Sequence, residues 1–334
     1  MRVLLVVNSS PEHLGAYLLS AAVAMGLKVE LVDCRSQVSG PKVWRAVHWR
    51  LLGHRPTRLY SFSREVVAAC ARFCPDVLLA TGQVALMRRD LEQIRRMGVK
   101  SANFVTDDPW NPAHRAGWFL KALPSYDWIF TPRMANISDF KNIGCANIEY
   151  LPFAYAPEVH FFEEPKGPDE ELRFRCDAAF IGGGDRDRFA WMDSLVNAGV
   201  SLKLYGGYWE RNAGLARCYC GFAYGADYRK AAAGARVNIV MGRKANRDDH
   251  AMRSYELAAM GACIVAEDTD DHRRLYGDDG ALFVSNPEEL AGAARQLLMD
   301  EPLRKRLARN AMQRVIGGKN SYRDRLRMIL EHHG

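Results

Sequence analysis

Short runs of apolar residues alternate along the chain with longer segments whose apolar residues recur every three or four positions. The short runs are predicted to be buried strands: Val3–Val7, Val29–Val32, Asp76–Ala80, Ala102–Val105, Trp128–Phe130, Asn147–Leu151, Ala178–Ile181, Leu202–Tyr205, Val237–Val240, Cys263–Ala266 and Leu282–Val284. Helices are predicted between them, for example over Arg64–Phe73, Val84–Met97 and Glu288–Leu298. Continuous apolar strands separated by helices are typical of parallel sheets covered on both faces.

A polar break interrupts this alternation near the middle of the chain. Within Glu158–Arg175, the stretch Glu163–Glu171 is rich in charge and is interrupted by two prolines. We therefore expect an exposed linker over residues 156–176. The strands and helices on either side predict two tandem Rossmann-like α/β domains, 1–155 and 177–317. Because ligands of such folds bind beyond the carboxyl ends of the strands, we expect a ligand-binding cleft between the domains.

Composition narrows the class of protein. The 334 residues are 48% hydrophobic and 25% charged, which is ordinary for a globular protein with two cores. The eight cysteines include no Cys-x-x-Cys pair, which favours reduced thiols in the cytoplasm and excludes a disulfide scaffold or a zinc ribbon. Val3–Val7 is too short to span a bilayer and lacks the features of a secretory signal.

The net charge of +7 arises from an excess of basic residues in the first half of the chain. Residues 1–150 contain 19 Lys and Arg against 12 Asp and Glu, whereas the remainder contains 27 of each. The segment Lys42–Arg58 combines five basic residues with two tryptophans and contains no acid. It can lie on an anionic membrane, bind a phosphorylated acceptor or stack on nucleic acid, and nucleic acid is the least favoured of these. The alternative is a helix packed by its Trp and Leu residues, with a solvated basic face.

The strongest local pattern runs from Asp248 to Ala266. It predicts a loop, a helix that ends at Gly261 and a buried strand. Arg253 and Glu256 are three residues apart and share one face of that helix. They can form a simple surface pair. Alternatively, the helix N-terminus can bind a diphosphate while the carboxylate one turn further on binds ribose hydroxyls.

The segment Arg253–Gly261 resembles the donor-binding helix of the GT-B glycosyltransferases, and the similarity is closest to the spore-coat-maturation (CgeB-type) family. In related retaining enzymes, two acids eight positions apart flank this helix. The resemblance therefore implies that Glu256 binds the donor ribose and that Asp248 contacts the transferred sugar. It also implies that a final helix over 320–332 packs back on the first domain.

Further segments resemble the same family. In the second half these are the glycine loop Gly182–Gly184 and the later segment Leu204–Trp209; in the first half they are Thr106–Trp110 and Tyr150–Ala154. Backbone N–H groups and nearby basic side chains in a glycine loop can bind phosphate, although such a loop can also be only a tight turn. The residues predicted to bind the donor are Gly183, Gly184, Arg186, Arg188, Arg243, Lys244, Arg253, Ser254 and Glu256.

The acids Asp107 and Asp108 end a strand of the first domain and are the catalytic candidates there, together with Asp248 in the second. We expect one of the pair to contact the sugar or an acceptor hydroxyl, although Asp-Pro is also a common turn. A metal site is not expected, because adjacent residues of an extended backbone point in opposite directions. His13 is a weaker candidate.

These patterns predict a glycosyltransferase that moves a sugar from a nucleotide-diphosphate sugar to an unknown glycan, lipid-linked or protein acceptor. We expect it to need neither metal nor cofactor, to retain the anomeric configuration, and to work in the cytoplasm with peripheral membrane contact through residues 42–58. The alternative is a non-catalytic nucleotide-sugar-binding or surface-coat assembly protein. An NAD-dependent enzyme is disfavoured, since no glycine segment matches G-x-G-x-x-G before a helix.

Overall fold

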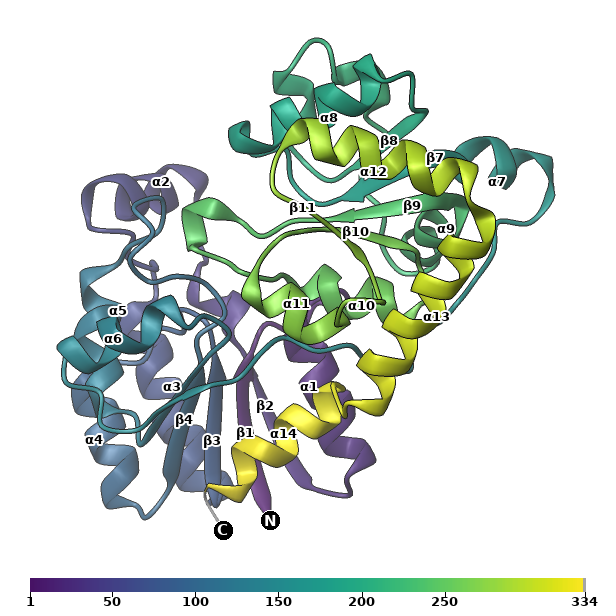
Figure 1. Cartoon of the computed structure of the whole chain (residues 1–334). Helices are drawn as coiled ribbons and strands as arrows, with labels where there is room; N and C mark the ends of the chain where they lie inside the picture. The colour runs from purple at the N-terminus through teal and green to yellow at the C-terminus, as the bar shows by residue number, and fades with distance from the viewer. Residues whose placement is uncertain (333–334) are drawn as a thin grey trace. The chain divides into compact units, whose positions relative to one another are not determined.

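The computed structural model describes residues 1–332, which form two compact units. Unit 1 comprises Met1–Pro152, Ala245–Arg247 and the segment from Tyr322 onward. Unit 2 comprises Phe153–Lys244 and Asp248–Ser321 (Figure 1). Each unit is built around its own sheet, and each is described here by itself.

Unit 1 contains a six-stranded parallel sheet in the order β2-β1-β3-β4-β5-β6. Its strands are β1 (Arg2–Val7), β2 (Lys28–Asp33), β3 (Val77–Thr81), β4 (Lys100–Phe104), β5 (Trp128–Thr131) and β6 (Ile148–Tyr150). Its helices are α1 (Leu14–Ala24), α2 (Lys42–Leu51), α3 (Leu59–Phe73), α4 (Arg88–Arg96), α5 (Gly117–Ala122), α6 (Ala135–Asn142) and α14 (Tyr322–Glu331). Short 3₁₀ turns occupy Cys34–Gln37 and Leu123–Ser125.

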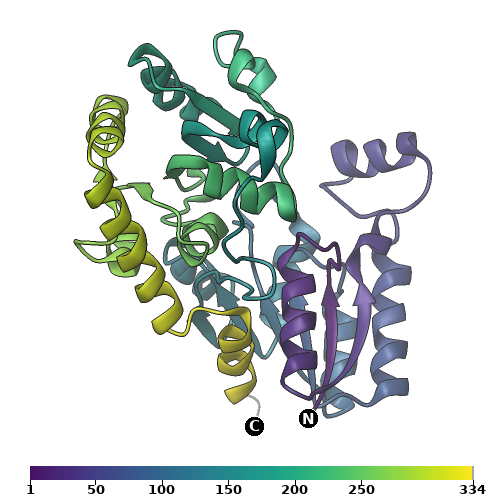
Figure 2. The same cartoon turned by 90° about the vertical axis from the view of Figure 1, so that its right-hand side faces the viewer.

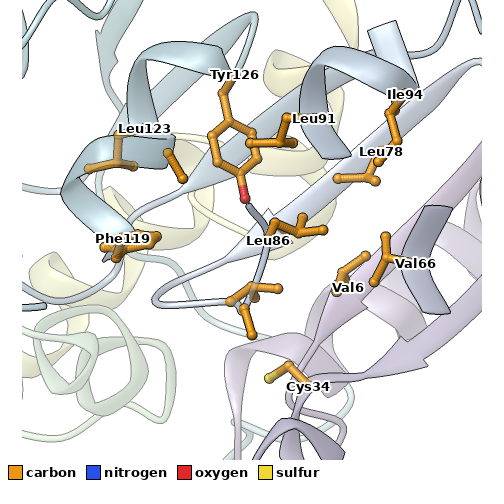
Figure 3. Packing of buried hydrophobic residues seen from close by; sticks show 14 of the residues in the cluster. Val6, Cys34, Val66, Leu78, Leu86, Leu91, Ile94, Phe119, Leu123 and Tyr126 are labelled. Carbon is orange, nitrogen blue, oxygen red and sulfur yellow. The ribbon is translucent and has the colours of Figure 1, made fainter. Parts of the chain in front are cut away.

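The core of unit 1 explains why its strands are so apolar. Every residue of β3 is buried, as are the last five of β1, because helices cover both faces of the sheet. Figure 3 shows Val6 and Leu78 from the sheet packed beside Val66 of α3, with Leu86 and Tyr126 nearby. Helix α14 also belongs to this unit: it packs on α1, and the rings of Tyr17 and Tyr322 are 5.4 Å apart.

Unit 2 contains a five-stranded parallel sheet in the order β11-β10-β9-β7-β8. Its strands are β7 (Cys176–Ile181), β8 (Leu202–Tyr205), β9 (Ala235–Val240), β10 (Ile264–Glu267) and β11 (Leu282–Val284). Its helices are α7 (Gly167–Phe174), α8 (Arg186–Asn197), α9 (Ala226–Gly234), α10 (Met252–Ala259), α11 (Asp270–Tyr276), α12 (Pro287–Met299) and α13 (Glu301–Gly317). Its 3₁₀ turns are Trp209–Arg211, Ala216–Cys218 and Lys244–Asn246.

The strand predictions are confirmed at every position, with shifts of one or two residues at the ends. The predicted helix over Val84–Met97 begins later, at Arg88. None of the helices within residues 1–332 is long and apolar enough to cross a membrane.

The expected linker over 156–176 is not irregular throughout. Residues 167–174 form α7, and the boundary between the units lies at Pro152, before the polar break. The acids that suggested an exposed linker pair with α9: Glu163 with Arg229 at 2.6 Å, and Glu170 with Lys230 at 2.5 Å. These ion pairs attach the segment to unit 2.

Candidate functional site

Helix α10 starts at the carboxyl edge of the unit 2 sheet, and its first turn is fixed by a buried serine. The Ser254 hydroxyl accepts a hydrogen bond from the N–H of Ala251 at 3.0 Å and lies 2.9 Å from Nε2 of His272. Since Ser254 is fully buried, its hydroxyl caps the helix and is not presented to solvent. In this structure the Ser254 hydroxyl is used within the protein, and its contact with a donor stays a prediction.

His272 is the group that holds this cap. Its Nδ1 lies 2.8 Å from the carbonyl oxygen of Glu267, so Nδ1 carries the proton and Nε2 accepts from Ser254. Burial lowers the pKa of His272 to about 4. The imidazole is consequently neutral at neutral pH, and the two hydrogen bonds specify one tautomer.

Glu256, one turn into α10, is a buried carboxylate with several partners. The hydroxyl of Tyr228 donates to Oε2 at 2.9 Å, and the guanidinium of Arg253 binds the same oxygen. His160 Nε2 lies 3.5 Å from Oε1, which accepts no hydrogen bond within residues 1–332. Burial raises the pKa of Glu256, but Arg253, His160 and the Tyr228 hydroxyl together outweigh it, so the net pKa is lowered.

Because burial lowers the pKa of His160, Arg253 provides the permanent positive charge beside this carboxylate. Arg253 is also the partly exposed member of the group. Its guanidinium donates to the carbonyl oxygen of Ile181 at 3.2 Å and lies over the ring of Tyr228 at 4.5 Å. Ile181 ends β7, immediately before the glycine loop, so Arg253 joins α10 to that loop.

Two glycine loops pack directly against each other at this edge of the sheet. The N–H groups of Gly182 and Gly184 donate to the carbonyl oxygens of Tyr205 and Gly207, each at 2.8 Å. Gly206 has φ of +121°, and a Cβ there would lie 2.5 Å from the Gly182 oxygen. The glycines thus permit the loops to touch, and the N–H of Gly184, one of the two glycines predicted to bind the donor, already donates to a carbonyl oxygen.

The basic side chains near these loops differ in their availability. Arg188 is buried and donates to the carbonyl oxygens of Gly183 at 2.8 Å and Gly242 at 2.9 Å, and burial lowers its pKa. It therefore joins the loops after β7 and β9, and its predicted contact with the donor phosphate stays a prediction. Arg186 and Lys244 are exposed and form no salt bridge with residues 1–332.

Arg243 and Asp248 occupy the loop that connects β9 to α10. Arg243 pairs with Asp185, the residue before α8, at 2.9 Å. The Asp248 carboxylate accepts from the backbone N–H of Arg243 at 3.3 Å. A Cβ on Gly242 would lie 2.1 Å from the carbonyl oxygen of Asp248, so the loop closes tightly on itself. The tip of this loop, Ala245–Arg247, is part of unit 1.

In unit 1, Asp108 is an anchoring residue. It is buried, and its carboxylate accepts hydrogen bonds from Arg247 at 2.6 and 3.0 Å and from Asn136 at 2.9 Å. Burial raises its pKa, but the hydrogen bonds from Arg247, Trp110 and Asn136 outweigh burial and lower it. The Asp108 oxygens thus hold the loop tip, and the expectation that one of Asp107 and Asp108 contacts the sugar or an acceptor hydroxyl stays a prediction.

Asp107 is exposed and accepts a hydrogen bond from Asn246 at 3.3 Å. His13 caps α1 by accepting from the N–H of Gly15 at 3.3 Å, and burial lowers its pKa. Among residues 1–332, no three His, Cys, Asp or Glu side chains are grouped so that they could hold a metal ion.

The structure thus brings Arg253, Glu256, the glycine loops and Arg243 to one edge of unit 2, and it places Asp107 and Asp108 in unit 1. The sequence did not reveal Tyr228, His160 or Arg247, because each meets its partner across a long stretch of chain. The one sequence feature that could have indicated such partners was Glu256, because an acid on the buried face of a helix requires hydrogen-bond or charged partners.

Comparison with known proteins adds to this geometry. Residues 188–331 match the family model for glycosyl transferase-like proteins. No curated protein matches the chain. Among solved structures, a sucrose-phosphate synthase from Thermosynechococcus elongatus is 14% identical with a TM-score of 0.67, over 99% of this chain and 98% of that one.

The HepE protein of Anabaena, solved with UDP-glucose, is 11% identical with a TM-score of 0.63, over 99% of both chains. A putative UDP-N-acetylglucosamine 2-epimerase from Listeria monocytogenes is 13% identical with a TM-score of 0.57, over 99% of this chain and 94% of that one. These likenesses establish the fold, which is that of the GT-B glycosyltransferases: two Rossmann-like domains with parallel sheets. A shared fold does not determine the reaction, which depends on the residues of the site.

Proposed function

We propose that the protein is a glycosyltransferase that binds a nucleotide-diphosphate sugar in unit 2 and transfers the sugar to an acceptor held by unit 1. The observation that carries the proposal is the position of Arg253. It lies at the carboxyl edge of the unit 2 sheet, held by Glu256 and by the end of β7, within the segment that matches the glycosyl transferase-like model. The resemblance of Arg253–Gly261 to the CgeB-type family supports the same proposal.

In the proposed reaction, an acceptor oxygen bonds to the anomeric carbon, and the bond from that carbon to the diphosphate oxygen breaks. The electron pair of that bond leaves with the diphosphate, and the acceptor proton is released to water. Negative charge therefore develops on the leaving diphosphate. Arg253, Arg186 and Lys244, with the N-terminal end of α8, supply positive charge at this edge without a metal ion. Retention of configuration is proposed from the family resemblance of Asp248 and Glu256.

Glu256 has two roles in the proposal. It positions Arg253, and its Oε1 accepts a ribose hydroxyl in the complex. In the structure this carboxylate is fully buried, so a ribose reaches it only after the side chains that cover it move. Support for the second role comes from Oε1 itself, which is buried and accepts no hydrogen bond from the part of the chain that the structure describes. UDP is the first nucleotide to test, because the HepE structure contains UDP-glucose.

The test is consumption of the donor. The full chain is incubated with UDP-glucose and a panel of other nucleotide sugars, and release of the nucleotide diphosphate is followed with and without chelator. We expect release with at least one donor, unaffected by chelator, and a large loss in Glu256→Gln. Glu288→Gln, on the exposed face of α12, is the matched control.

Each other outcome has a defined meaning. Binding of a nucleotide sugar without turnover would favour the non-catalytic alternative. Loss of activity with chelator, restored by magnesium or manganese, would contradict the metal-independent step. Failure of every nucleotide sugar to bind would refute the proposed function.

A further inference from the structure

Helix α2 in unit 1 buries none of its ten residues. Val43, Trp44 and Leu51 are 73%, 61% and 76% exposed, and together with Val47 their spacing places them on one face of the helix. Figure 2 shows α2 standing apart from the other helices of unit 1. The structure therefore contradicts the interpretation of α2 as a helix packed by its Trp and Leu residues, and it leaves an apolar stripe without a partner within residues 1–332.

The base of α2 is nevertheless firmly attached. Before the helix, the N–H of Ser39 donates to the Thr57 hydroxyl at 3.0 Å, and that hydroxyl donates back to the Ser39 carbonyl at 2.7 Å. After the helix, the His54 ring lies 2.7 Å from the carbonyl oxygen of Arg115, and Trp118 donates to the carbonyl of His54 at 3.2 Å. These contacts hold the helix at a fixed place on unit 1.

A groove of about 880 Å³ adjoins the end of α2. Apolar side chains, among them Leu52, Trp118 and Ile143, line it, and Arg55 and Lys121 stand at its wall. The exposed stripe of α2 and this groove together form one surface that is apolar in composition and bordered by positive charge.

The charge of this region has a single sign. Between Asp33 and Glu65 the chain contains seven Lys and Arg residues and no acid. Arg58 pairs with Glu65 at 2.9 Å, whereas Lys42, Arg45 and Arg50 form no salt bridge with residues 1–332. These three basic groups of α2 therefore remain available for an external anion, with Arg50 at the edge of the apolar stripe and Lys42 and Arg45 on the opposite side of the helix.

We propose that α2 and the adjoining groove dock unit 1 on the surface of an anionic lipid bilayer. An amphipathic helix with exposed Trp and Leu on one face and basic residues on the rest of its surface is suited to the boundary between headgroups and acyl chains. A second copy of the chain fits poorly, because a two-fold contact would bring the unpaired bases of α2 toward the same bases of the other copy. The proposal does not depend on the proposed sugar transfer.

The test is sedimentation of the full chain with vesicles of phosphatidylcholine alone or with 30% phosphatidylglycerol, in the absence of any nucleotide. We expect binding only to the anionic vesicles, and weaker binding as salt rises. Each basic residue near an anionic leaflet contributes about fivefold in affinity, so replacing Lys42, Arg45 and Arg50 with Ser is expected to weaken binding about 100-fold. The double variant Trp44→Ser, Leu51→Ser is expected to lose at least about tenfold.

The matched control replaces three exposed bases of unit 2, Arg217, Arg306 and Arg309, with Ser, and is expected to bind like the parent chain. All variants should keep the thermal midpoint of the parent, because α2 buries no residue and the three bases replaced in the control are exposed. The proposal is overturned if anionic vesicles do not bind, if the control loses as much affinity as the α2 variants, or if the α2 variants bind like the parent. Dissociation of a dimer by the α2 variants, or tighter binding of RNA than of vesicles, would likewise overturn it.

Discussion

Replacement of His272 with Gln is expected to remove a specific part of the pH dependence of stability. His272 is buried and neutral, with a pKa of about 4 in the folded chain against 6.5 when exposed. Between these values the unfolded chain binds a proton that the folded chain does not. Unfolding therefore becomes easier as the pH falls through this window, and the contribution is complete below about pH 4.

The size of the effect follows from the two pKa values. Each unit of difference corresponds to about 1.4 kcal/mol, and between pH 7 and pH 5 the linkage relation gives a loss of about 2 kcal/mol in the free energy of unfolding. Because His13 and His160 also have lowered pKa values, the parent chain is expected to lose more than this in total. The contribution of His272 is the difference between parent and variant.

The assay is urea unfolding at pH 7 and pH 5, followed by tryptophan fluorescence and by circular dichroism. His272→Gln is expected to be less stable than the parent at pH 7, since the cap at Ser254 is weakened, but to lose about 2 kcal/mol less on acidification. His48→Gln on α2 is the control, and its free energy of unfolding should fall between pH 7 and pH 5 by the same amount as that of the parent. Equal pH dependence in parent and His272→Gln would refute the assignment of His272 as a buried neutral cap.

Two further changes test the loops that support the site. Arg247→Ala leaves the Asp108 carboxylate buried without its charged partner and is expected to cost about 1–3 kcal/mol at pH 7. Because Arg247 helps to hold the pKa of Asp108 below its usual value, this cost is expected to shrink as the pH falls through the acid range and the carboxylate becomes protonated. Chemical unfolding at neutral and acidic pH measures this, and no change would mean that the ion pair is not formed. Gly206→Ala forces a Cβ to 2.5 Å from the Gly182 oxygen and is expected to lower the thermal midpoint by several degrees, whereas Gly292→Ala, with open space on α12, should leave it equal or higher.

The sheets were predictable because a strand that is buried on both faces appears in the sequence as an uninterrupted run of apolar residues. All five residues of β3 are buried, and the run Val77–Ala80 is apolar throughout. Helix α7 was not predictable in the same way, because Glu170 within it and Glu163 just before it pair with Lys230 and Arg229 of α9, about sixty residues further along the chain. Charged side chains that a local sequence pattern assigns to solvent can therefore form ion pairs with distant residues once the chain folds.

The site, too, could be predicted only in part. The position of Arg253 and Glu256 on one helix face followed from their spacing, and the structure places them together. Spacing could not reveal that the carboxylate would be fully buried, nor that Arg188 would turn inward to bind two loop carbonyls. Exposure and burial of a charged side chain depend on partners from distant segments, and a single sequence does not specify these.

The most direct test of the central claim is calorimetric titration of UDP into the parent chain, Glu256→Gln and Glu288→Gln. The proposed site predicts that the parent and Glu288→Gln bind with the same affinity. It predicts that Glu256→Gln loses about 2–4 kcal/mol of binding free energy, because the change removes a charged hydrogen-bond acceptor and releases Arg253. Circular dichroism checks that the variant is folded. Equal binding of UDP by the parent and a folded Glu256→Gln would contradict the claim that this edge of unit 2 is the donor site.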